Sequence, residues 1–238
     1  MLKIPLRVKM YTRLLSYENA KASKSIEYGY LNFILYLAPH TLSGWNVCAG
    51  SSPECREDCL YGSGFGKFEN VQKSRIAKTK RYFVDREKFL SDLRKDIIRG
   101  IKYSKQLDLL ACFRLDGTSD LFVAKHFVDL YNEAIFYDYT KVYNRFNKIV
   151  DLKNYDLTYS YSGRNKSNCL KVLASGKNVA VAFKNCLPKK LWGYPVVDGD
   201  IHDLRFLDPK GSVVGLTPKG QGVDLVGSKF FIDGKVIE

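Results

Sequence analysis

The chain has 238 residues, of which 45% are hydrophobic and 13% aromatic, and its formal net charge is +13. This length and composition allow one large domain with a substantial core and exclude wholesale disorder. A membrane span is also excluded, because the apolar run YLNFILYLAP (30–39) is much shorter than the roughly 20 residues that cross a bilayer.

The N-terminal segment MLKIPLRVKMYTRLL (1–15) lacks the apolar core and small-residue cleavage site of a signal peptide. We therefore expect a cytoplasmic protein in a reducing compartment. The whole of 1–238 is expected to form a single domain, because no Pro/Ser-rich linker interrupts it. Its parts would be an N-terminal extension (1–26), a core of βα repeats (27–192) and a turn-rich, β-rich element (193–238).

Residues 27–37 are rich in aromatic and apolar side chains and predict a strand. The segment that follows, which we call the cysteine loop (46–66), holds three cysteines and then a glycine-rich run. The cysteines, with the spacing C-x6-C-x3-C, are Cys48, Cys55 and Cys59. In a reducing compartment such a cluster indicates a metal site more than a disulfide framework.

The spacing leaves several metal sites open. A structural zinc site prefers four ligands, commonly in C-x2-C pairs, and neither such a pair nor a nearby histidine occurs here. Three thiolates suit a [4Fe–4S] cluster better, in which the fourth iron is left open for a substrate or cofactor. The alternatives are zinc and no metal. The other cysteines are predicted to be small buried hydrophobes: Cys112, Cys169 and Cys186.

Residues 68–106 show apolar side chains at three- and four-residue intervals, which predict two helices divided by an N-cap at Asp85. The region is basic, since residues 1–105 hold 20 Lys and Arg against 10 Asp and Glu. Such a stripe can attract DNA or RNA, or can simply be a solvated helix face. The candidate nucleic-acid residues are Lys73, Lys78, Lys80 and Arg81.

The middle of the chain alternates between short apolar strands and helix-like spans. The predicted strands are 107–115, 134–140, 156–162, 178–183 and a further one at 193–199; the helix-like spans are 121–133, 141–151 and 165–176. This alternation predicts a parallel sheet with right-handed crossovers. With the strand at 27–37 the count is about six, which fits a partial (β/α) barrel, and an open doubly wound sheet is the competitor.

Polar residues follow each predicted strand, where parallel α/β folds place their functional groups. The residues expected around one cavity, on the same side as the cysteine loop, are Arg114, Asp116, Ser119, Asp120, Tyr139, Lys141 and Ser160. Helix capping is the alternative role for Ser119 and Asp120. A second polar cluster, Asp198, Asp200 and Asp203, can bind a divalent ion or form an ordinary turn.

Several motifs together resemble a phage protein family. They are SGWNVCAGSSPECREDCL, SRIAKTKRYF, FRLDGTSDL, FYDYTKV, GKNVAVAF and PVVDGDIHDLRFLDPKGSVVGL. The family is that of the phage "gene 88 product", and the resemblance runs from about residue 25 to 222. Its cysteine loop and βα repeats are similar in turn to radical S-adenosylmethionine enzymes, whose partial barrels carry a three-cysteine cluster after the first strand.

The resemblance implies a role for each site residue. Cys48, Cys55 and Cys59 would hold the cluster. The catalytic groups would be Asp116, Asp120 and Lys141, and the groups holding S-adenosylmethionine would be Arg114, Ser119, Tyr139 and Ser160. We therefore expect a phage-encoded iron–sulfur protein in the host cytoplasm. We expect it to be a radical-type enzyme, and nucleic acid is one candidate substrate. The alternatives are a replication-associated nucleic-acid-binding protein without redox chemistry and a metal-dependent nuclease.

Overall fold

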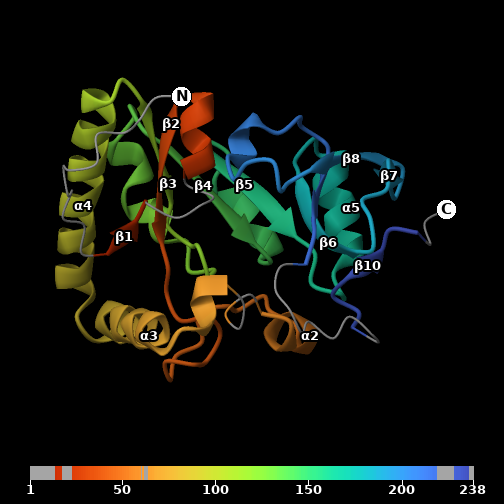
Figure 1. Ribbon diagram of the computed structural model, residues 1–238, viewed down its shortest axis with the longest axis horizontal. Helices are drawn as coiled ribbons and strands as arrows, with labels where there is room; N and C mark the ends of the chain where they lie inside the picture. The colour runs from red at the N-terminus through yellow and green to blue at the C-terminus, as the bar shows by residue number, and fades with distance from the viewer. Residues whose placement is uncertain (1–13, 18–22, 60, 62–63, 219–227, 236–238) are drawn as a thin grey trace.

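The computed structural model describes residues 14–17, 23–59, 61, 64–218 and 228–235 (Figure 1). These residues form a mixed α/β fold around a ten-stranded sheet. In spatial order the strands are β1 (Leu15–Ser16), β2 (Tyr30–Leu35), β3 (Leu110–Arg114), β4 (Ile135–Thr140), β5 (Tyr155–Ser160), β6 (Val179–Lys184), β9 (Val213–Leu216), β8 (Tyr194–Asp198) and β7 (Lys190–Leu191), while β10 (Ile232–Asp233) pairs with β6.

Most of the sheet is parallel. Every pairing along the path from β2 to β8 is parallel, and β1 and β7 add short antiparallel edges. The parallel sheet predicted from the βα alternation is therefore confirmed, with the predicted strands at or near their expected places. The turn-rich C-terminal element contributes strands to this same sheet, because β9 lies between β6 and β8.

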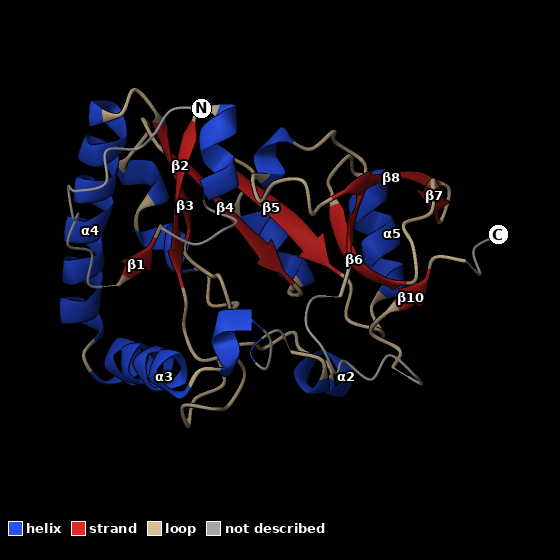
Figure 2. Cartoon of the chain, viewed as in Figure 1, coloured by secondary structure: helices blue, strands red, loops and turns tan. Residues whose placement is uncertain are grey.

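The α-helices of the described residues are α2 (Pro53–Glu57), α3 (Glu69–Val84), α4 (Arg86–Gln106) and α5 (Lys166–Ala174). Helix α4 contacts β2 and β3, and α5 contacts β5 and β6, whereas α2 and α3 lie below the sheet in the view of Figure 2. Asp85 separates α3 from α4 and accepts a hydrogen bond from Lys88 N, which confirms the predicted N-cap. Glycine at position 100 lets α4 approach the sheet, because a Cβ there would lie 3.2 Å from the rings of Phe113 and Phe33.

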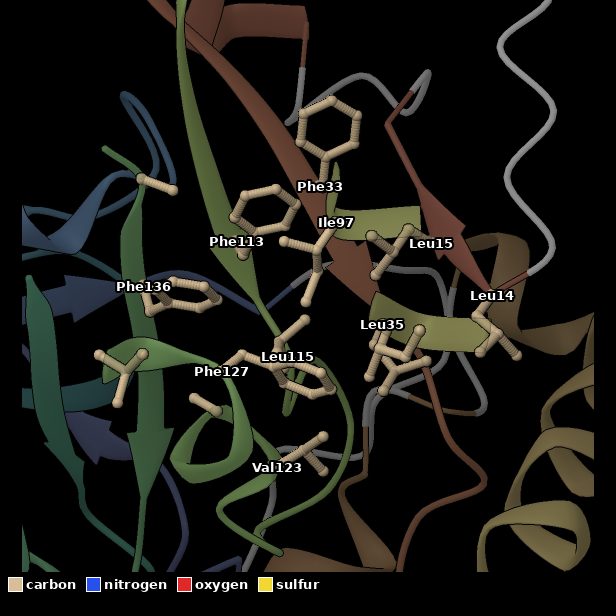
Figure 3. Packing of buried hydrophobic residues seen from close by; sticks show 14 of the residues in the cluster. Leu14, Leu15, Phe33, Leu35, Ile97, Phe113, Leu115, Val123, Phe127 and Phe136 are labelled. Atoms are coloured by element: carbon tan, nitrogen blue, oxygen red, sulfur yellow. The ribbon is translucent and has the colours of Figure 1, made fainter. Parts of the chain in front are cut away.

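The main core lies between α4 and the first strands (Figure 3). Three fully buried rings stack across neighbouring strands: Phe33 on Phe113 at 5.2 Å between centroids, and Phe113 on Phe136 at 5.3 Å. On the opposite face, Leu204 packs with Cys112 and Tyr137. Both faces of the central strands are therefore covered, as a parallel sheet requires.

Two predicted helices are wrong. The span 121–133 contains only the 3-10 helices Val123–His126 and Val128–Leu130, and the span 141–151 contains only the 3-10 helix Tyr143–Lys148. The left-handed backbone of Phe122 (φ 59°) prevents an α-helix from beginning there. Among the described helices, none is both long and apolar enough to cross a membrane.

Candidate functional site at the carboxyl edge of the sheet

The cysteine loop lies across the ends of three neighbouring strands. Asp120 N, in the segment after β3, donates to Val47 O at 2.8 Å. Gly50 lies against the residue that follows β4, because a Cβ at Gly50 would be 2.8 Å from the carbonyl carbon of Lys141. Ser52 Oγ donates to Ser162 O, beyond β5, at 2.6 Å. The strands point toward this edge, where α2 and α3 lie in Figure 1.

Helix α2 extends the attachment of the loop. Ser52 is its N-cap, and the Ser52 hydroxyl accepts a hydrogen bond from Cys55 N at 3.1 Å. Glu54 pairs with Arg164, whose Nε lies 2.8 Å from Glu54 Oε1, and this hydrogen bond lowers the pKa of Glu54 to about 2. Asp58 accepts a hydrogen bond from the Ser228 hydroxyl. Contacts from distant parts of the chain therefore fix the loop in place.

The three thiols of the loop are free and half-buried. Cys48 Sγ accepts a hydrogen bond from His40 N at 3.3 Å and donates to Thr118 O at 3.8 Å. Burial raises the pKa of Cys48 to about 11 and also raises the pKa of Cys59, while the Lys141 cation acts on both in the opposite direction. Both side chains are therefore protonated thiols at neutral pH, and a metal ion would displace their protons on binding.

The described part of the chain holds no group of three or more His, Cys, Asp or Glu side chains arranged to share a metal ion. The donor set itself suits an iron–sulfur cluster, because thiolates are the usual ligands of such clusters. Binding would require the loop to draw Cys48, Cys55 and Cys59 together.

Next to the loop lies a buried network of Asp116, Asp120 and Arg145, of which the sequence predicted only the two carboxylates as site residues. Asp116 accepts hydrogen bonds from the Ser119 hydroxyl at 2.7 Å and from three consecutive backbone N–H groups, those of residues 121–123. These bonds shape the turn after β3. Asp116 and Ser119 thus hold this turn, and their catalytic and cofactor-binding roles stay predictions.

Asp120 connects the network to the end of β4. Its carboxylate accepts hydrogen bonds from the Thr140 hydroxyl and from Lys141 N, both at 2.8 Å. Burial raises the pKa of Asp120, against the effect of the Arg145 cation, whose Nη2 lies 2.6 Å away. Arg145 also lies 3.6 Å from Asp116. Arg145 was not predicted, and its place in a helix-like span gave no signal that it would face two carboxylates.

Lys141, one of the predicted catalytic residues, lies beside the cysteine loop, where the sequence placed it. Its backbone contacts Gly50, and its Nζ donates to Ser160 Oγ at 3.1 Å. Lys141 and Ser160 are therefore brought together beside the cysteine loop, as predicted for groups that follow adjacent parallel strands.

Arg114 and Tyr139 lie on the opposite face of the sheet. The Arg114 guanidinium is 4.5 Å from the centre of the Tyr139 ring and pairs with Asp203 at 3.1 Å. Strand alternation explains this for β4: Tyr139 points to the opposite face from its neighbour Thr140, whose hydroxyl bonds to Asp120. Asp116 and Asp120 lie beyond the end of β3, where alternation no longer applies. The predicted single cavity is thus divided between two faces.

The sequence profile of the family Gene product 88 matches residues 11–234. The chain belongs to the Gene product 88 family. This family is a phage protein family, as the motifs above indicated. No curated protein and no solved structure matches the chain.

The basic residues predicted to contact nucleic acid do not act alike in this Gene product 88 chain. Lys73 pairs with Glu69, and Arg81 pairs with Asp92. Lys78 donates to Leu14 O at 3.3 Å and is partly buried, whereas Lys80 is exposed. Half of the predicted positive charge is therefore offset by carboxylates.

The structure also places the remaining cysteines and the C-terminal carboxylates. Cys112 and Cys169 are buried, as predicted, but Cys186 is exposed, which corrects the prediction for that residue. In the C-terminal carboxylate cluster, Asp200 N donates to Asp198 Oδ1 at 2.8 Å, as in an ordinary turn, and Asp200 accepts hydrogen bonds from Thr217. Asp203 pairs instead with Arg114. Among the described residues, no three of these carboxylates lie together in a group that could hold a metal ion. The nuclease alternative stays a prediction.

Proposed function

We propose that this Gene product 88 protein binds a [4Fe–4S] cluster through Cys48, Cys55 and Cys59. The observation that carries the proposal is the place of the cysteine loop, which lies over the carboxyl ends of adjacent parallel strands. Open α/β sheets bind their ligands at this edge. We also propose that the sheet is a partial (β/α) barrel and that the cysteine loop lies over the end formed by the carboxyl termini of its strands.

The neighbouring cations support the proposal electrostatically. Lys141 favours the ionised forms of both Cys48 and Cys59, and Arg75 favours that of Cys59. A cluster held by three thiolates carries negative charge, which these two cations would offset. When bound, the cluster would supply one-electron transfer and an open iron for a further ligand.

The radical S-adenosylmethionine reaction stays a prediction from the resemblance alone. Of the groups assigned to that cofactor, Arg114 and Tyr139 contact each other on the far face, and Ser119 is bonded to Asp116. The residues beside the loop that could contact a ligand on the open iron are Lys141 and Ser160.

Metal analysis of protein purified without oxygen tests the proposal. We expect iron, acid-labile sulfide and a brown colour, and we expect their loss when Cys48, Cys55 or Cys59 is replaced by Ala. Cys186→Ala is the matched control, because this exposed cysteine lies outside the loop and its loss should leave the iron content unchanged. A colourless protein with full zinc occupancy would contradict the proposal.

A further inference from the structure

An open cavity of about 450 Å³ lies between α3 and the carboxyl end of β2, beside the cysteine loop. The residues that matter for its chemistry are Tyr36, Phe65, Asn70, Ser74, Arg75 and Lys78. Its volume falls within the range of small-molecule sites, which is roughly 300–1,000 Å³.

The cavity places two cations side by side, and none of its described lining residues is acidic. The Arg75 guanidinium lies between two aromatic rings, 4.8 Å from the centre of the Tyr36 ring and 5.8 Å from that of Tyr61. Its Nε is buried and has no hydrogen-bond partner among the described residues. Lys78 Nζ bonds to one carbonyl, Leu14 O, which leaves further donors available.

The other basic side chains of α3 show that this arrangement is unusual for the helix. Lys73 and Arg81 each pair with a carboxylate, as solvated or half-buried cations commonly do. Burial, together with the neighbouring Arg75 cation, lowers the pKa of Lys78 to about 8, and the Asp96 carboxylate opposes this effect only in part. The two neighbouring cations repel each other, and a bound anion would reduce this repulsion.

We propose that this cavity binds the phosphate group of a mononucleotide-sized phosphate ester. Arg75 and Lys78 would hold the phosphate, because charge-assisted hydrogen bonds to phosphate are the strongest that such side chains make. Asn70 and Ser74 supply neutral polar groups on the same helix face. A bare phosphate would leave most of the volume empty, whereas the Phe65 ring, 70% exposed at the rim, offers a surface on which a base can stack.

Calorimetric titration of the full chain with the four nucleoside monophosphates tests this proposal. We expect at least one to bind, and we expect its unphosphorylated nucleoside to bind far more weakly. Lys78→Gln and Arg75→Gln should each raise the dissociation constant by about tenfold, the loss expected for one charge-assisted hydrogen bond. Lys80→Gln, which removes an exposed cation from the same helix, should leave it unchanged.

The proposal fails if no nucleoside monophosphate binds, or if Lys80→Gln weakens binding as much as Lys78→Gln. Binding of a single-stranded oligonucleotide that neither mononucleotide nor inorganic phosphate displaces would also overturn it. Competition by inorganic phosphate keeps the test valid if a variant fails to fold. The iron content of Lys78→Gln separates this site from the cluster, because that variant should retain any metal bound by the cysteines.

Discussion

Arg145 is a buried cation between two carboxylates, and its side chain is only 4% exposed. It lies 2.6 Å from Asp120 and 3.6 Å from Asp116, on the face of the sheet behind the cysteine loop. Its guanidinium also lies 5.0 Å from the centre of the Phe122 ring, the residue whose left-handed backbone redirects the chain after β3. One side chain thus joins the turns after β3 and β4.

Arg145→Met should lower the free energy of unfolding by about 3–5 kcal/mol, because it leaves two buried carboxylates without their cation. Urea denaturation measures this loss. Arg164→Met is the matched control: the Arg164 side chain is 62% exposed in its pair with Glu54, so solvent screens this pair and the loss there should be much smaller. Equal losses in the two variants would contradict a structural role for the buried pair.

Among the elements, the contact between the cysteine loop and the end of β4 depends on a missing side chain. A Cβ at Gly50 would lie 2.8 Å from three atoms of Lys141, two of which are backbone atoms that cannot rotate away. The close approach of Gly50 therefore fixes how the loop sits on the strand end.

Gly50→Ala should lift the loop from β4 while leaving the sheet intact. Because Cys48 is two residues away and half-buried, its thiol should become more accessible, and its reaction with a disulfide reagent should become faster. Mass spectrometry of the labelled peptides measures each cysteine separately. Buried Cys112 and Cys169 serve as internal controls, and an unchanged rate at Cys48 would show that the loop position does not depend on Gly50.

Local sequence signals located most of the elements. The apolar run of β6 and the N-cap at Asp85 carry their own patterns, so their positions were predictable. The 3-10 helices were not, because the backbone conformation decides them: Phe122 is left-handed, and the Asp116 carboxylate holds the turn around it by accepting from the N–H groups of Leu121 and Phe122. Strand β9 was missed because only Val213 and Val214 stand out within a turn-rich stretch.

The candidate site was predictable in part. Spacing placed the cysteine loop after β2, and parallel topology placed Lys141 beside it. The division of the strand-end residues between two faces depends on which residue ends each strand, and sequence patterns leave that uncertain by a few positions. The sequence could not single out Arg75 among many basic residues, because only the fold shows that its Nε is buried without a hydrogen-bond partner among the described residues.

At the scale of the whole molecule, the C-terminal element (193–238) completes the sheet. β9 pairs with β6, and β8 pairs with β9. These two strands therefore protect the edge of β6, which carries the buried Val179 and Val181. The core of βα repeats at 27–192 consequently ends on an uncovered parallel strand if the C-terminal element is absent.

A chain truncated after residue 192 should therefore not fold cooperatively. It loses β8, β9 and β10, and β6 becomes an exposed apolar edge. Circular dichroism during thermal denaturation should show a sharp transition for the full chain and none for the truncated one. A cooperative transition in the truncated chain would mean that residues 193–238 are an independent appendage.

The attachments of the cysteine loop span long stretches of sequence, and this has a consequence during synthesis. The bond from Ser52 to Ser162 joins residues 110 positions apart, and that from Ser228 to Asp58 joins residues 170 apart. At the usual rate of translation, the ribosome needs roughly 5 to 20 seconds to add the first of these stretches. For a time of this length after they leave the ribosome, the thiols lack the segments that later hold the loop. A cluster bound as proposed above would therefore require the thiols to stay reduced until β5 has joined the sheet.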